Sequence, residues 1–409
     1  MPACVPRLGI EWGHGLLIMT KPYSRKRERL LLSALRLKCR LGNMASRIWS
    51  KTNTVYVWDR IPFYRQMWAA AASKLSAQFS ELADGIWNIR LGTSQTYINI
   101  HRVQLDDAVI SSLSGNKPFC YEVLRKEHIP VPDHVTFRAD ELDRAWQFMK
   151  RKKGFYVVKP ALETGSGMGV TTHVQSLQEC RYAIALASLY GRLIILEDLV
   201  PGECYRLLIL NGKMIHAVRR RGVRIQGDGR STIAQLIEQE NKRRREEHAA
   251  HAGQPITWNR DMAATLLAQG LSADSVIQDK REVLVQSHDA PDAKHVEVRT
   301  VYDEVATGLI CKELRQQVER AAMLLHSKFA GVDVITLDPS LPLEKSGGVI
   351  NEINTNPGLH HHYVSSSHDA CRTSDDIGPT VSVLTHLLGQ NGRLDNEEMP
   401  ALQGERGKP

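Results

Sequence analysis

Two carboxylates and an amide late in the chain have the spacing of a metal-binding set. Asp333 lies in the apolar segment Gly331-Val332-Asp333-Val334-Ile335, and Glu352 and Asn354 follow 19 and 21 residues later. Side chains alternate along a strand, so Glu352 and Asn354 point to one face, where Asp333 on a neighbouring strand can join them. Such oxygens suit Mg²⁺, which takes its other ligands from phosphates and water. The pattern favours a magnesium site; the structural alternative is that both carboxylates are paired with arginines.

A lysine followed by a glycine-rich loop precedes this set. Lys159 ends the apolar run Phe155-Tyr156-Val157-Val158, and glycines occupy alternate positions in Gly165-Ser166-Gly167-Met168-Gly169. Glycines let backbone N–H groups approach phosphate oxygens, and the lysine adds a positive charge. The loop is not a Walker A loop, because no Gly-Lys-Ser/Thr follows the glycines, and its spacing differs from the dinucleotide fingerprint. It is predicted to bind phosphate, with a packing role as the alternative.

Strands and helices must position these residues. Short apolar runs predict strands at 155–158, 193–197, 332–337 and 349–353. Asn211-Gly212, between apolar runs at 205–210 and 213–218, predicts a hairpin because both turn positions need positive φ. Thr232 and Gln235 have the spacing of a capping box that begins a helix. A helical pattern from Phe63 to Phe79 and a β-like run at 96–100 precede this region, whose alternation of strands and helices indicates α/β or α+β.

Length and composition indicate a globular protein without a membrane span. The chain has 409 residues, which predicts two or three domains or lobes. Its apolar runs are far shorter than the roughly 20 residues that a bilayer span needs, and the N-terminus has no convincing secretory signal. The seven cysteines are scattered and form no Cys-x-x-Cys pair, which predicts reduced thiols and no disulfide partner. A cytoplasmic location is expected.

The positive charge is concentrated at the start of the chain. Residues 1–60 hold 12 Lys/Arg against 3 Asp/Glu, whereas the rest holds 41 against 42. The segment Arg25-Lys26-Arg27-Glu28-Arg29 and the leucines after it fit a basic amphipathic helix, and a solvated leader is the alternative. An acidic partner, an acidic membrane surface or nucleic acid are the targets that such a charge would suit.

The ordered combination of these motifs resembles the ATP-grasp superfamily. Within it, the segments at 201–208, 211–213, 219–221 and 227–233 resemble the ATP-grasp region of cyanophycin synthetase, and the C-terminal half of bifunctional glutathione synthetase is similar. The resemblance implies an α+β ATP-grasp fold, in which two α/β lobes grip ATP between antiparallel sheets, preceded by a small α/β N-terminal domain. The expected domains are a basic leader (1–60), the small N-terminal domain (61–115), the ATP-grasp domain (116–390) and a polar tail (391–409).

Matching positions imply roles in nucleotide and metal binding. The resemblance implies that ATP contacts Lys117 and Lys159, a closing loop that includes Gly165, Ser166, Gly167 and Gly169, and the hinge residues Glu197, Asp198 and Leu199. It implies catalytic arginines at Arg206 and Arg220, and Mg²⁺ (or Mn²⁺) ligands at Asp333, Glu352 and Asn354. Cys204 stands where the family usually has a ribose-binding acid. The adjacent Glu203 is included among the nucleotide-binding candidates, although strand alternation points it to the opposite face.

The implied activity is that of an ATP-dependent carboxylate–amine ligase. An acyl phosphate formed from ATP would react with an amine of an amino acid or small peptide, releasing ADP and phosphate. The alternative is a catalytically degenerate nucleotide-binding or scaffold protein, which Cys204 favours. A homo-oligomer is also expected. Three histidines, His360-His361-His362, directly follow the metal segment. They are expected to be partly exposed in a loop, and a substrate-binding role is left open.

Overall fold

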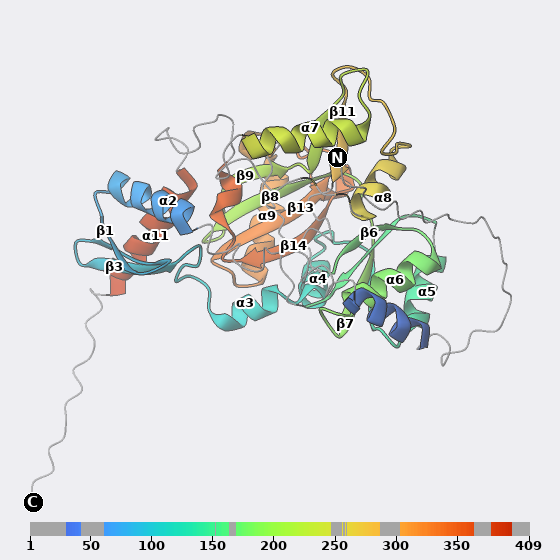
Figure 1. The fold of residues 1–409 in the computed structure, drawn as a ribbon. Coiled ribbons are helices and arrows are strands. Elements are labelled where there is room, and N and C mark those ends of the chain that lie inside the picture. Colours follow the sequence, from blue (N-terminus) through green and yellow to red (C-terminus); the bar gives the residue numbers. More distant parts are fainter. Residues whose placement is uncertain are drawn as a thin grey trace, which may run out of the picture.

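The computed structural model describes residues 30–41, 61–151, 153–162, 169–246, 256, 258, 260–286, 303–363 and 378–394 (Figure 1). Most of the basic leader, Gly165, Ser166, Gly167 and residues 395–409 of the polar tail lie outside these ranges. Within them, no helix combines the length and hydrophobicity that crossing a bilayer requires. None of the five cysteines that the structure describes forms a disulfide.

A small α/β unit lies at one side of the molecule (Figure 1). Its helix α2 (Ile61–Lys74) packs on an antiparallel sheet with the order β1-β2-β3. The strands are β1 (Gln78–Ala83), β2 (Ile86–Leu91) and β3 (Ser94–Asn99). Helix α11 (Gly378–Leu394), from the far end of the chain, packs against α2 and β3 and completes the same hydrophobic core. Segments more than 250 residues apart in sequence therefore form one unit.

The predicted first helix of this unit was too long, and two of its strands were missed. Helix α2 ends at Lys74, Ser76 adopts a left-handed backbone (φ 54°), and Phe79 lies on β1. The spacing that suggested a helix through Phe79 therefore crosses a reversal of the chain. Strand β1 is exposed along almost its whole length, so its sequence lacks the apolar alternation by which a strand is recognised.

The first lobe of the larger part is built on a four-stranded antiparallel sheet with the order β4-β7-β5-β6. Its strands are β4 (His134–Arg138), β5 (Tyr156–Pro160), β6 (Thr171–Val174) and β7 (Leu193–Asp198). Helices α5 (Leu142–Lys150) and α6 (Leu177–Ala187) pack on this sheet. Helices α3 (Ala108–Ser114) and α4 (Lys117–Lys126) lead into the lobe from the small unit (Figure 1).

A helix from the basic leader, residues 30–41, also packs on this first lobe (Figure 1). Leu32 and Cys39 are buried, and Leu35 is partly buried against the core of the lobe. The Arg36 side chain donates a hydrogen bond from Nε to Ser188 Oγ (2.6 Å). One face of this helix, at a spacing of three and four residues, is therefore fixed to the protein, because positions so spaced share one side of a helix.

The second lobe is a five-stranded antiparallel sheet with the order β12-β9-β8-β13-β14. Its strands are β8 (Glu203–Leu210), β9 (Lys213–Arg220), β12 (Glu304–Val305), β13 (Phe329–Thr336) and β14 (Val349–Thr355). Its helical segments are η2 (Thr307–Leu309), α9 (Lys312–Leu324), α10 (Leu343–Ser346) and η3 (Leu359–His362). Alternate residues of β8 serve two cores: Leu207 packs in the core that includes α9, and Leu208 packs in the core of the small unit.

An insertion between β9 and β12 has a core of its own. It consists of β10 (Val223–Gln226), α7 (Ile233–Glu246), α8 (Arg260–Ala268) and β11 (Glu282–Gln286). Strands β10 and β11 form a separate antiparallel pair. In Figure 1 this insertion lies at the top of the molecule, above the second lobe.

Local sequence signals predicted the turn and the helix start that frame this region. Asn211 and Gly212 join β8 to β9 with positive φ angles of 48° and 72°, which confirms the predicted hairpin. The Thr232 backbone N–H donates to the Gln235 side chain (2.9 Å), and the Gln235 N–H donates to Thr232 Oγ1 (3.3 Å). This reciprocal pair confirms the capping box at the start of α7.

Candidate active site

A row of charged side chains crosses the sheet of the second lobe. Asp333 on β13 lies directly opposite Arg206 on β8 and opposite Glu352 on β14. Residues that face each other across antiparallel strands project from the same side of the sheet, so the three side chains share one face. Arg220, opposite Cys204 on the neighbouring strand, lies on this face as well. The antiparallel register therefore brings together residues that are up to 146 positions apart.

Lys117 and Glu352 form the first ion pair of this region. Lys117 begins α4, and its Nζ lies 3.1 Å from Glu352 Oε1. Burial acts to lower the pKa of Lys117, but the neighbouring Glu352 carboxylate outweighs burial and raises it. Burial likewise acts to raise the pKa of Glu352, but Lys117 and Lys159 outweigh burial and lower it. Both groups are therefore charged at neutral pH.

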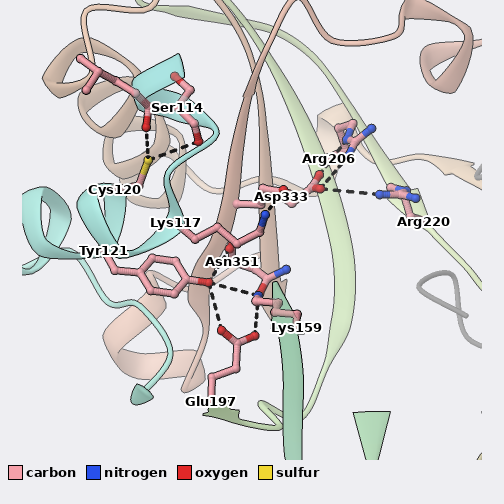
Figure 2. A network of polar contacts seen from close by, with 12 residues as sticks. Ser114, Lys117, Cys120, Tyr121, Lys159, Glu197, Arg206, Arg220, Asp333 and Asn351 are labelled. Atoms are coloured by element: carbon pink, nitrogen blue, oxygen red, sulfur yellow. Dashed lines mark hydrogen bonds and ion pairs between the residues drawn. The ribbon is translucent and has the colours of Figure 1, made fainter. Parts of the chain in front are cut away.

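Lys159 lies in a second buried network, shown in Figure 2. Its Nζ is 2.6 Å from Glu197 Oε1 and donates to Asn351 Oδ1 at 3.3 Å. The Tyr121 hydroxyl lies 2.6 Å from the Asn351 backbone oxygen, 3.3 Å from Glu197 Oε2 and 3.4 Å from Lys159 Nζ. Burial raises the pKa of Tyr121 well above its ordinary value, so the hydroxyl keeps its proton. Asn351 on β14 thereby links the second lobe to Lys159 and Glu197 in the first lobe.

Asp333 is held by two arginines. Arg206 donates to both carboxylate oxygens, from Nε at 2.7 Å and from Nη2 at 2.6 Å. Arg220 Nη1 lies 3.6 Å from Asp333 Oδ2 on the other side (Figure 2). Arg220 is almost fully buried, and its Nε and Nη2 atoms have no hydrogen-bond partner among the described residues. These two N–H groups form the edge of a guanidinium that binds carboxylates and phosphates bidentately, so Arg220 offers an anion-binding edge.

A cleft of about 350 Å³ lies between the two lobes and is lined by most of these side chains. The predicted residues that line it are Lys117, Lys159, Glu197, Asp198, Leu199, Arg206, Arg220, Glu352 and Asn354. Three residues of the predicted closing loop, Gly165, Ser166 and Gly167, lie outside the described ranges. The fourth, Gly169, is described, has a positive φ of 76° and does not line the cleft. Cationic and anionic side chains therefore line a cavity of the size of a small-molecule site together.

Two further candidates do not line the cleft. Asp333 lies behind Arg206, which takes up both of its oxygens. Glu203 is half-exposed and pairs with Arg224 (3.1 Å) on the other face of the sheet, as strand alternation predicts. Its neighbour Cys204 is buried and lines the cleft instead.

Sequence reasoning did not identify Asn351 or Tyr121. The pairing of β13 with β14 shifts register between Asp333 and Val334, so that Asn351 is an extra residue between Glu352 and Ile350. Such a bulge re-aims a side chain that regular alternation would turn away from Glu352. Tyr121 is fully buried within α4 and has no sequence signal that separates it from a core aromatic residue.

The expectation that the three histidines are partly exposed was wrong. His360, His361 and His362 form η3 and are 6%, 5% and 2% exposed. His361 lines the cleft. The Nδ1 atoms of His362 and His216 on β9 lie 3.1 Å apart, so one imidazole donates to the other. The three histidines are buried because η3 passes between the sheet of the second lobe and the small unit. Three consecutive polar residues in a sequence do not predict such a tertiary contact.

The oxygen donors of the cleft fit a divalent cation that is shared with a polyphosphate. Glu352 and Asn354 are two residues apart on β14, and both line the cleft. No group of three or more His, Cys, Asp or Glu side chains in the part of the chain that the structure describes is arranged to hold a metal ion. Mg²⁺ needs few protein ligands when phosphates and water supply the others. Glu352 and Asn354 are chemically suited to that arrangement, whereas both carboxylate oxygens of Asp333 already accept hydrogen bonds from Arg206.

The two antiparallel sheets and the cleft between them define an ATP-grasp fold, which confirms the fold predicted from the sequence. The chain is similar to the crystal structure of a bifunctional glutathione synthetase from Pasteurella multocida, with a TM-score of 0.52 and 18% identity. That similarity covers 81% of this chain and 44% of the glutathione synthetase. No protein-family model matches the chain.

Curated cyanophycin synthetases and bifunctional glutathione biosynthesis proteins, the two kinds of protein that the motifs resemble, are similar to this chain in sequence. The chain is 29% identical over 279 residues to cyanophycin synthetase of Synechocystis sp., covering 65% of this chain and 31% of that protein. It is 30% identical over 266 residues to cyanophycin synthetase of Geminocystis herdmanii, covering 62% and 28%. It is 24% identical over 306 residues to the bifunctional glutathione biosynthesis protein of Listeria innocua, covering 72% and 37%. The chain thus spans about a third of the length of these relatives.

Proposed function

We propose that this protein is an ATP-dependent ligase that joins a carboxylate to an amine of an amino acid or small peptide. The observation that carries this proposal is the cleft that Lys117 on α4 and Lys159 on β5 line together with Glu352 and Asn354 on β14. Each lysine is neutralised by a carboxylate, Glu352 or Glu197, so both can be buried without an uncompensated charge. The phosphates of ATP are the anions that such a pair of buried lysines would bind.

The proposed reaction has two steps. An oxygen of the substrate carboxylate attacks the γ-phosphorus of ATP, the bond to the β-phosphate oxygen breaks, and ADP leaves. The amine nitrogen then attacks the carbonyl carbon of the acyl phosphate, phosphate leaves with the bonding electrons, and the nitrogen loses a proton. No protein nucleophile is needed, so the residues act by positioning the reactants and by stabilising negative charge.

The residues divide this work by their position in the cleft. Lys117 and Lys159 would bind the phosphates, and the bidentate edge of Arg220 would bind the transferring phosphoryl group or the substrate carboxylate. Glu352 and Asn354 would hold Mg²⁺ or Mn²⁺, which when bound neutralises phosphate charge. Burial of Lys117, Lys159 and Arg220 strengthens their interaction with the developing charge, because water is largely excluded from their surroundings.

The experiment is a measurement of ADP release with Mg-ATP across a panel of amino acids and dipeptides, with the mass of each product determined. At least one pair of substrates should give an amide whose mass equals the sum of both minus water. Glu352→Gln should reduce this activity by on the order of 100-fold, as expected when one electrostatic group at a reacting centre is lost. Glu81→Gln is the matched control, since Glu81 is a half-exposed carboxylate paired with Arg65 (2.8 Å) far from the cleft.

The outcome separates the ligase from a nucleotide-binding protein without turnover. Cys204, which lines the cleft where a ribose-binding acid was expected, is the observation that favours the second candidate. Stabilisation of the protein by Mg-ATP together with an absence of ADP release across the whole panel would support it and contradict the ligase. Loss of activity in Glu352→Gln, with Glu81→Gln unchanged, would support the ligase.

A further inference from the structure

The buried histidine run connects the cleft with the small N-terminal unit. Leu359 packs in the core of the small unit, whereas His361, two residues later, lines the cleft between the lobes. The short helix η3 therefore has one side in each environment. The packing of the small unit on η3 therefore helps to set the position of His361 in the cleft.

Tyr64 on α2 fixes the position of His360. Its hydroxyl lies 2.6 Å from His360 Nδ1, and the His360 backbone N–H donates to the same hydroxyl at 3.5 Å. The hydroxyl and Nδ1 share one proton, and the tautomer of His360 decides which of the two donates. Both side chains are buried, so water cannot replace the bond.

Gly358 makes room for this contact. A Cβ atom at Gly358 would lie 2.4 Å from His360 Cε1 and 2.7 Å from its Nδ1. The absence of a side chain there allows the His360 ring to fold back against the turn and to reach Tyr64. The preceding Asn356 is held from the same unit, because its Oδ1 accepts a hydrogen bond from the Val103 N–H (3.0 Å).

The position of His360 is passed on to His361 by ring contact. The two ring centroids are 3.9 Å apart, with the planes inclined by 42°. His361 lines the same cleft as Arg206 and Arg220. These two arginines make that end of the cleft positively charged, which suits a substrate that carries a carboxylate. A histidine N–H in this position can donate to a carboxylate oxygen, as the arginines do.

We propose that Tyr64 is a positioning residue for the substrate site: through His360 it holds His361 in the cleft, where His361 contacts the carboxylate-bearing substrate. This inference rests on the proposed ligase function. It makes the small N-terminal unit part of the substrate site, although none of its residues lines the cleft. Binding of ATP depends on the lysines at α4 and β5, so the unit acts on the other substrate alone.

The test compares Tyr64→Phe with the parent protein under the ADP-release assay. Removal of the hydroxyl keeps the buried ring and frees His360, so KM for the non-nucleotide substrate should rise by on the order of 10-fold, as small displacements in a site can cause. KM for ATP should be unchanged. His361→Asn should raise the same KM, and adding Tyr64→Phe to it should have little further effect, because the two changes act on one contact.

The control is Thr96→Val in the same unit. Thr96 is fully buried, and its hydroxyl donates to Gln104 (3.3 Å), away from the histidines. It should lower the stability of the small unit without changing either KM. A Tyr64→Phe protein that is active with both KM values unchanged would overturn the positioning role alone, whereas a parent protein that releases no ADP with any substrate would contradict the proposed function instead.

A second measurement does not require turnover. In protein labelled with ¹⁵N-histidine, the ring nitrogens of His360 are assigned with His360→Asn, and those of His361 with His361→Asn. Tyr64→Phe should shift the Nδ1 resonance of His360 and also change the His361 signals, whereas Thr96→Val should change neither. Signals of His361 that are identical in the parent and in Tyr64→Phe would overturn the inference.

Discussion

Arg206 and Asp333 face each other across β8 and β13 and share a bidentate ion pair, with N–O distances of 2.7 and 2.6 Å. Both side chains are buried. The pair occupies the centre of the charged row that runs across the sheet from Arg220 to Glu352. It therefore lies between the positively charged Arg220 and the Glu352 carboxylate, which pairs with Lys117. This was the arrangement that the sequence left as an alternative to a direct metal ligand at Asp333.

Breaking this pair from one side should be strongly destabilising. Asp333→Asn leaves the buried Arg206 charge without its counter-charge, and we expect a loss of about 3–5 kcal/mol in the free energy of unfolding. Urea denaturation of Asp333→Asn, Arg206→Met and the double variant would give the coupling energy. The double variant should be more stable than the sum of the two single losses predicts. Additive losses would contradict a direct pair.

The exposed pair of Arg65 and Glu81, with an N–O distance of 2.8 Å, is the control for that cycle. Both side chains are accessible to solvent, which screens their attraction. Glu81→Gln should therefore change the free energy of unfolding by less than about 1 kcal/mol.

Arg220→Lys should impair turnover more than nucleotide binding. A lysine keeps the charge but cannot present two parallel N–H groups, which are the part of Arg220 that lacks a partner among the described residues. We expect kcat to fall on the order of 100-fold, while the Kd for Mg-ATP changes little. Steady-state kinetics and calorimetric titration with a non-hydrolysable ATP analogue would measure the two effects. Equal losses in both would assign Arg220 to nucleotide binding.

Gly202→Ala should destabilise the start of β8. Gly202 has a φ of 133°, and an added Cβ would lie 2.5 Å from the backbone carbon and oxygen of Thr336 on β13. The strained backbone and the clash together should lower the free energy of unfolding by about 1–3 kcal/mol or more. Thermal unfolding would show the loss as a lower Tm. Gly154→Ala is the control, because its Cβ would meet no atom within 4 Å.

Stability should fall as the pH falls below about 6.5, in part because of His362. Burial, together with His216, Arg206 and Arg220, lowers the pKa of His362 well below its ordinary value of 6.5. Between the lowered pKa and 6.5 the unfolded chain binds a proton that the folded protein does not, so unfolding becomes easier as protons are added. One such group changes the free energy of unfolding by roughly 1.4 kcal/mol per pH unit in that window.

Urea unfolding at pH 7.5 and 5.5 would test this expectation. His362→Asn removes the titrating ring and should reduce the difference between the two pH values. A pH dependence that is the same in His362→Asn would show that His362 does not contribute.

The sequence by itself determined the local elements and the types of residue in the site. The Asn211-Gly212 hairpin and the Thr232 capping box follow from backbone preferences of the residues involved, which do not depend on distant contacts. The apolar strands that carry Lys159, Asp333 and Glu352 could be found for the same reason, because alternation and burial are visible in a short window.

The tertiary structure decided which side chains meet. The bulge beside Asp333 turns Asn351 toward Lys159, and the packing of the small unit against η3 buries the histidines and links Tyr64 to His360. Helix α11 joins α2 across more than 300 residues of chain, and no local pattern marks that partner. These outcomes depend on strand register and on packing between distant segments, whereas sequence periodicity reports only which side of an element is buried.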